Sequence, residues 1–159
     1  MDLRLLYAIL LTILPGTELR FGLPVGMLYA QENNVSLILI FLLIVLINIL
    51  LIFFIFFFLD YLHKWLMKFK FYEKFFKAFL KRFQKKVDKF EKRHDTLGFF
   101  ALTLFVAIPL PGTGAWSGCL VSWVLGLDRK KSVLAIALGV SIAGLLIFLG
   151  VLGFFSLLF

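Results

Sequence analysis

The stretch IPLPGTGAWSG, at residues 108–118, decides the fold because two prolines and three glycines interrupt an apolar run there. Proline lacks a backbone N–H and glycine favours turns, so a membrane helix is not expected to continue through it. A closely similar stretch, ILPGTELRFG, occurs at residues 13–22. A shift of 96 residues, the separation of Pro15 from Pro111, superposes the two stretches. The sequence therefore predicts a protein built from two related halves.

The repeat includes the surroundings of each break. Short apolar runs flank the breaks within residues 1–31 and 97–127, and a long apolar run follows each pair, within residues 35–62 and 132–159. The residues expected to shape the breaks are Pro15, Gly16, Thr17, Gly22 and Pro24 in the first half and Pro109, Pro111, Gly112, Thr113, Gly114 and Gly118 in the second. Each half therefore has the order short segment, break, short segment, long segment.

Segment length indicates how each part meets the membrane. A bilayer core about 30 Å thick needs about 20 apolar residues in a helix, which only the two long runs supply. We expect each short pair to form a re-entrant helical hairpin, whose broken backbone must be buried in protein or line a wet cavity. Each half then crosses the membrane once, so the two halves form an inverted repeat. A signal peptide is the alternative for the first run, although MDLR is barely cationic and no cleavage site of small residues follows.

The composition is that of an integral membrane protein. Apolar residues make up 62% of the 159 residues, and the mean hydropathy is +1.04, far above that of soluble domains. The length suits one domain, so we expect a single all-α membrane domain of residues 1–159. The single cysteine, Cys119, permits no intramolecular disulfide. We find no acid pair at catalytic spacing and no metal-ligand cluster, so we expect no enzyme, cofactor or metal site.

The net charge of +8 is concentrated between the two halves. Twelve of the 17 Lys and Arg lie within residues 63–96, where large apolar side chains recur at helical spacing. We expect a basic amphipathic helix that binds anionic lipid headgroups; the alternative is packing on a partner or on the chain itself. No motif for reading nucleic acid accompanies the charge, so no nucleic-acid partner is expected.

The positive charges also predict the sidedness of the chain. The cluster DRKK, at residues 128–131, is expected to form a turn on the same face as residues 63–96. By the positive-inside rule that face is cytoplasmic, which leaves both termini outside.

Two stretches resemble a known family. ELRFGLPVG, at residues 18–26, and FVAIPLPGTGAWSG, at residues 105–118, resemble the signature stretches of the putative small multidrug export family, and the resemblance covers essentially the whole chain. That family is in turn similar to the DedA (VTT-domain) superfamily, whose re-entrant hairpins carry charged residues near prolines. The resemblance implies an integral transport protein of the prokaryotic cell membrane. Within the superfamily it also implies lipid handling, including flipping of polyprenyl-phosphate carriers and lipid scrambling.

The chain departs from the DedA pattern in its second hairpin. That pattern usually places an arginine there, whereas this chain has GTGAW at residues 112–116. A DedA charge relay therefore does not transfer directly to this protein.

Glu18 and Arg20 are the only charges expected well inside the membrane, where charged residues are costly and are functional-site candidates. A 96-residue shift places them on Gly114 and Trp116, so a symmetric scaffold would hold an asymmetric site. Arg20 is a candidate ligand for a phosphate or carboxylate, helped by the dipoles of hairpin helix N-termini. Glu18 is a candidate for taking up and releasing a proton. The structural alternative is a Glu18–Arg20 pair that only neutralises the hairpin tip.

Two further residues complete the candidate substrate and proton site. Trp116 is expected to stack on Arg20 or on a substrate. Asn48 lies alone among apolar residues of the first long run, where it either forms an interhelical hydrogen bond or lines the pathway.

The sequence favours a small membrane transporter, with proton coupling through Glu18, that moves an amphipathic or anionic substrate. The first alternative is a flippase or scramblase for phosphate-bearing lipids such as polyprenyl phosphates, and the second is a membrane scaffold that transports nothing. Two full spans and two hairpins are few segments to enclose a transport path across the membrane. A homodimer is one arrangement that would supply more of them.

Overall fold

The computed structural model describes residues 3–66, 68, 95–110 and 112–158, and the regular structure of this part of the chain is helical. The helices are α1 (Leu3–Ile13), α2 (Glu18–Glu32), α3 (Leu37–Leu66), α5 (Asp95–Ala107), α6 (Ala115–Val124) and α7 (Arg129–Leu158). The prediction of an all-α fold is confirmed for these residues. The expected basic amphipathic helix lies mostly outside the described residues, as does Pro111.

Two expected boundaries are wrong by a few residues. Helix α3 continues to Leu66, so residues 63–66 belong to the first long helix and not to the linker. Helix α7 begins at Arg129, inside the cluster that was expected to be a turn. The carboxylate of Asp128 accepts a hydrogen bond from the backbone N–H of Lys131 at 2.9 Å, which is the contact of a helix N-cap. The helix therefore starts directly after Asp128.

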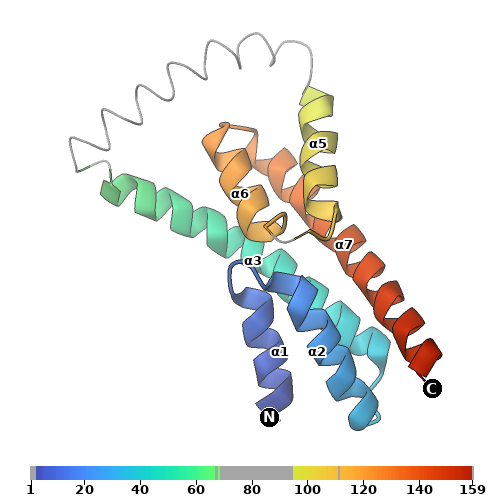
Figure 1. The fold of residues 1–159 in the computed structure, drawn as a ribbon. Coiled ribbons are helices and arrows are strands. Elements are labelled where there is room, and N and C mark those ends of the chain that lie inside the picture. The colour runs from blue at the N-terminus through green and yellow to red at the C-terminus, as the bar shows by residue number, and fades with distance from the viewer. Residues whose placement is uncertain (1–2, 67, 69–94, 111, 159) are drawn as a thin grey trace.

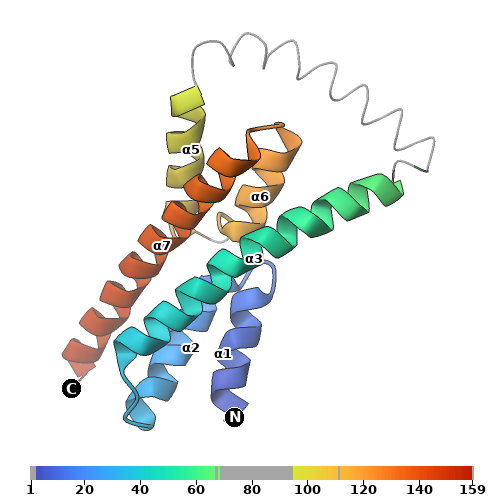
Figure 2. The same ribbon diagram turned by 180° about the vertical axis from the view of Figure 1, so that it is seen from behind.

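The order of helices repeats as short, short, long. Figures 1 and 2 show α1–α2 and α5–α6 as two hairpins that approach each other tip to tip from opposite ends of the molecule, with the two termini on the same side. The backbone at the two breaks is alike: Gly16 has a φ of +91° and its repeat partner Gly112 a φ of +84°. Glycine adopts this left-handed conformation without steric cost, which explains the matching glycines.

Small residues set the close packing within each hairpin. A Cβ on Gly22 would lie 1.9 Å from Thr12 Oγ1 of α1, and a Cβ on its repeat partner Gly118 would lie 2.7 Å from Val106 Cγ2 of α5. Both contacts are shorter than real Cβ contacts. Glycine at these two positions therefore lets the paired helices lie against each other.

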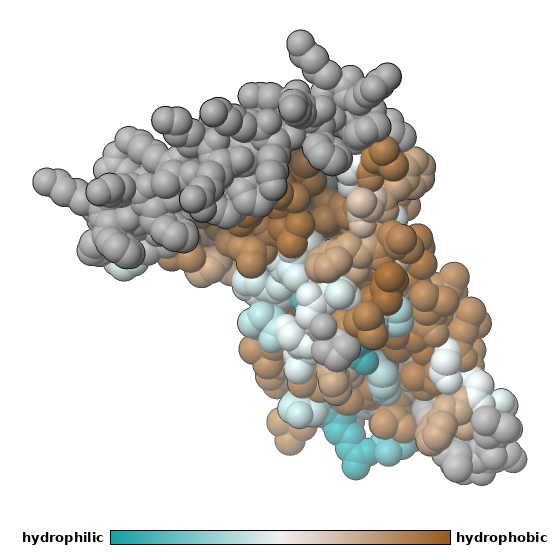
Figure 3. Space-filling view, turned by 45° about the horizontal axis from the view of Figure 1, so that its top comes forward, coloured by the Kyte–Doolittle hydropathy of each residue, from teal (hydrophilic) through white to brown (hydrophobic). Residues whose placement is uncertain are grey.

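The two long helices, α3 and α7, cross, and the hairpins pack against them. The rings of Phe41 and Phe148 lie 5.0 Å apart, and a Cβ on Gly144 of α7 would lie 3.0 Å from Val45 Cγ2 of α3. The segments Leu37–Trp65 and Arg129–Phe154 are long and apolar enough to cross a membrane. Much of the described surface is apolar (Figure 3), as expected where lipid replaces water.

Candidate functional site

The candidate site lies where the two hairpin tips meet, and Glu18 is its central group. The Glu18 side chain comes from the start of α2 and is only 5% exposed. Its Oε2 accepts a hydrogen bond from the backbone N–H of Ala115 at 2.9 Å, and its Oε1 accepts one from that of Trp116 at 3.1 Å. These N–H groups belong to the first turn of α6, where they have no partner within the helix. A carboxylate of the first hairpin therefore caps a helix of the second, at the end where the helix dipole favours negative charge.

Gly114 makes this contact sterically feasible. A Cβ at position 114 would lie 1.3 Å from Glu18 Oε2, which no side chain can tolerate. Gly114 is also the repeat partner of Glu18. The second hairpin therefore lacks an acid at this position because the acid of the first hairpin occupies the space.

The backbone of Glu18 is in an unusual conformation. Its φ is +49°, in the left-handed region that side-chain-bearing residues seldom adopt. Such conformations cost about 1–3 kcal/mol and concentrate at functional sites. The conformation coincides with the start of α2, where the chain leaves the break and the Glu18 carboxylate points to the second hairpin.

Arg20 also reaches the second hairpin. Its Nη2 donates to Thr113 Oγ1 at 2.7 Å and lies 3.4 Å from the carbonyl oxygen of Ile108. The Thr113 hydroxyl lies 2.6 Å from the same Ile108 oxygen, so the arginine reinforces the bend between α5 and α6. The Arg20 Nε is buried and has no hydrogen-bond partner among the described residues. An unpaired buried N–H is costly, and it leaves one donor for a group that the described residues do not supply.

Glu18 and Arg20 do not form a direct ion pair within the described part of the chain; each is bonded to the second hairpin. This arrangement differs from the expected alternative in which the two charges only neutralise each other. The pair instead joins the hairpins through two separate contacts.

Trp116 and Asn48 lie beside this junction, at the end of α1. The indole N–H of Trp116 donates to the carbonyl oxygen of Ile13 at 2.9 Å, and the stacking of Trp116 on Arg20 or a substrate stays a prediction. Asn48 is buried, and its Nδ2 donates to the carbonyl oxygen of Thr12 at 3.3 Å. This is the interhelical hydrogen bond considered from the sequence. The Asn48 Oδ1 has no partner among the described residues.

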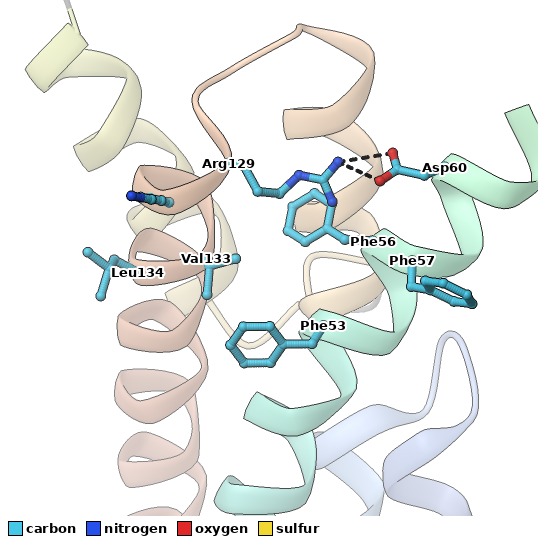
Figure 4. A pocket seen from close by; sticks show the side chains of 8 residues that line it. Phe53, Phe56, Phe57, Asp60, Arg129, Val133 and Leu134 are labelled. Carbon is cyan, nitrogen blue, oxygen red and sulfur yellow. Dashed lines mark hydrogen bonds and ion pairs between the residues drawn. The ribbon is translucent and has the colours of Figure 1, made fainter. Parts of the chain in front are cut away.

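A second polar cluster, away from the tips, was not predicted. Asp60 of α3 accepts a hydrogen bond from Trp123 Nε1 at 2.8 Å. It also accepts one from Arg129 Nη2 at 2.9 Å (Figure 4). The Arg129 guanidinium also lies 4.3 Å from the centre of the Phe56 ring. The signal for this cluster was present, because Asp60 is an acid that ends a long apolar run and Arg129 a base that begins one.

The described residues contain no group of three or more His, Cys, Asp or Glu that could hold a metal ion. The arrangement at the tips instead offers hydrogen-bond donors for an anion. These donors are the first N–H groups of α6, now held by Glu18, and the unpaired Nε of Arg20.

The fold and the site define a small helical membrane protein with a charged junction between two broken-helix hairpins. A family model described as "Putative small multi-drug export protein" matches residues 18–146, which is most of the chain. The chain therefore belongs to this family, as the sequence predicted. No curated protein and no solved structure matches the chain. The wider similarity to DedA proteins stays a prediction.

Proposed function

We propose that this chain is a proton-coupled membrane transporter whose two halves are inverted repeats with re-entrant hairpins that meet inside the membrane. The family description, with its reference to export, supports a transport function. The observation that carries the proposal is the Glu18 carboxylate, buried at the junction of both breaks and bonded across it to Ala115 and Trp116. In this arrangement, residues 63–96 are cytoplasmic and both termini are outside.

In this proposal, the Glu18 carboxylate and the substrate compete for one anion site. Ionised Glu18 fills the N-terminus of α6 with two charge-assisted hydrogen bonds. A protonated carboxyl group accepts these bonds more weakly, because one oxygen becomes a hydroxyl and the charge is lost. The first N–H groups of α6 then become available to an anionic group of the substrate, as helix N-termini commonly bind anions. A substrate anion and a proton therefore bind together.

Arg20 completes the anion site. Its Nη2 is held by Thr113, while its buried Nε is unpaired among the described residues. A phosphate, sulfonate or carboxylate placed between Arg20 and α6 would satisfy this donor, and a guanidinium suits such planar recognition. The apolar surface around the junction favours an amphipathic anion. A second copy of the chain would close the path around it.

The test is transport by purified protein in liposomes with an imposed pH gradient. The probes are taurocholate, an amphipathic anion, and rhodamine 6G, a lipophilic cation. We expect wild-type protein to accumulate taurocholate in response to the gradient and Glu18→Gln to lose this response, because the amide cannot exchange a proton. Glu18→Gln should still allow taurocholate exchange without a gradient, since the neutral amide resembles the protonated acid. Arg20→Lys should weaken taurocholate transport, because lysine lacks the planar donor fork.

The matched controls are Glu32→Gln and Arg4→Lys, which make the same changes in the exposed ion pair between the start of α1 and the end of α2. Both should transport as wild type. Gradient-driven accumulation that survives Glu18→Gln would contradict the proton role. Transport of rhodamine 6G but not taurocholate would contradict the anion site.

The second candidate function is scrambling or flipping of phosphate-bearing lipids. The Arg20 Nε, unpaired among the described residues, supports this function, because a lipid phosphate can accept its hydrogen bond as well as a soluble anion can. The same liposomes, assayed for headgroup accessibility of a labelled lipid, separate the two functions. Lipid movement that needs no gradient and is unchanged in Glu18→Gln would identify a scramblase.

A further inference from the structure

A groove between α3 and α7, away from the hairpin tips, has the composition of a lipid site. It has a volume of about 490 Å³ and is lined by Phe53, Phe56, Phe57, Asp60, Arg129, Lys130, Val133 and Leu134. Figure 4 shows Phe53 of α3 and Val133 of α7 directed into the space between the two helices, with Arg129 and Asp60 at its upper end. The groove is therefore apolar along its length and charged at one end.

The charged end carries an excess of donors. Asp60 is the one acid of the lining, and Arg129 and Lys130 are the two bases. Only the Nη2 of Arg129 donates to Asp60, and the Lys130 ammonium has no partner among the described residues. One positive charge and several N–H groups therefore remain for an anion at the end of the groove.

The apolar part faces outward. Phe53 is 56% exposed and Leu134 is 60% exposed, on the two helices that are long enough to span the membrane. In a membrane, acyl chains cover such surfaces. An acyl chain lying along Phe53, Val133 and Leu134 would bring its headgroup to the start of α7, where Arg129 and Lys130 are located.

We infer that this groove binds one bilayer phospholipid with an anionic headgroup, its phosphate held by Arg129 and Lys130. The excess positive charge at the end of the groove favours an anionic headgroup. The apolar lining continues into the membrane-facing surface, which favours a lipid over a soluble ligand. The Arg129–Asp60 bond and the packing of Arg129 on Phe56 hold the guanidinium in place before the lipid binds. This site does not depend on the transport proposed above.

The test is native mass spectrometry of the full chain in detergent, titrated with palmitoyl-oleoyl phosphatidylglycerol or the matching phosphatidylcholine. We expect phosphatidylglycerol to bind about fivefold more tightly than phosphatidylcholine, the contribution of roughly one lysine near an anionic lipid. Lys130→Gln should remove this difference and Lys130→Arg should keep it. Val133→Phe, which narrows the groove without changing charge, should weaken the binding of both lipids.

Arg4→Gln is the charge-matched control, because it removes one cation at the start of α1, on a different helix from the groove. It should leave the preference for phosphatidylglycerol unchanged. Equal affinity for the two lipids in the wild type, or an equal loss in Arg4→Gln and Lys130→Gln, would overturn the inference. Inorganic phosphate and glycerol phosphate should not displace the lipid at matched concentration. Displacement by either would show that the groove binds a free anion and no lipid.

Discussion

At the scale of single residues, the junction depends on Glu18 and on the space that Gly114 leaves for it. Two backbone N–H groups of α6 have the Glu18 carboxylate as their partner. Buried donors that lose a charged partner cost about 1–3 kcal/mol each. The same contact therefore contributes to stability and, in the proposed function, responds to protonation.

We predict that Gly114→Ala destabilises the protein by about 1–3 kcal/mol, because a methyl group there would displace the Glu18 carboxylate. The measurement is thermal unfolding in detergent. Gly150→Ala is the matched control, since a Cβ at that position of α7 meets nothing within 4 Å. Alanine should be neutral or stabilising there, because it favours helices over glycine. Equal stability of the two variants would show that Glu18 does not lie against Gly114.

The residues of the site differ in how far sequence could predict them. Glu18 and Arg20 were predictable because a charge beside a helix break in an apolar chain is a local signal. Their hydrogen-bond partners were not, since Ala115 and Thr113 come from a hairpin about 95 residues away along the chain. The sequence repeat pairs Gly114 with Glu18, but it does not explain why position 114 has no side chain. The explanation is the contact between the hairpin tips, which places the Glu18 carboxylate where that side chain would lie.

At the scale of elements, the positions of the two breaks and of the long helices followed from the sequence, because proline, glycine and run length act locally. Three residues expected to shape the breaks lie inside α2 and α6 instead: Gly22, Pro24 and Gly118. The start of α7 did not, since a cluster of charges after an apolar segment resembles a turn. The N-cap contact of Asp128 explains why these residues begin a helix and do not form a turn. The cluster of Asp60, Trp123 and Arg129 was missed for a different reason: the charges at the ends of the apolar runs are visible in the sequence, but their contact depends on how three helices pack.

The Asp60–Arg129 ion pair links α3 to α7, and we predict that it stabilises their contact modestly. The two side chains are 42% and 46% exposed, so we expect a coupling of about 0.5–1 kcal/mol between Asp60→Asn and Arg129→Gln in a double-mutant cycle. Asparagine keeps an acceptor for the Trp123 indole N–H, so the Asp60→Asn substitution measures the effect of the negative charge alone. The coupling should decrease in high salt, since half-exposed charges are screened. Strictly additive unfolding temperatures would contradict a direct interaction.

At the scale of the whole molecule, the proposed topology has two halves that enter the membrane from opposite sides. The hairpins point toward each other in Figures 1 and 2, and the breaks carry glycines of matching φ at positions 16 and 112. In the proposed topology, each short pair contributes an even number of crossings whether or not it spans, so the two halves are inverted if each long helix crosses once. The sidedness of the loops is therefore the most direct consequence of the proposed topology.

The measurement that tests this claim most directly is cysteine labelling in intact cells, in a Cys119→Ser background. One variant carries Asn33→Cys at the end of α2, and the other carries Lys131→Cys at the start of α7. A membrane-impermeant maleimide should label position 33 in intact cells and position 131 only after permeabilisation. Labelling of both positions in intact cells, or of neither, would contradict the inverted repeat and the proposed transport path with it.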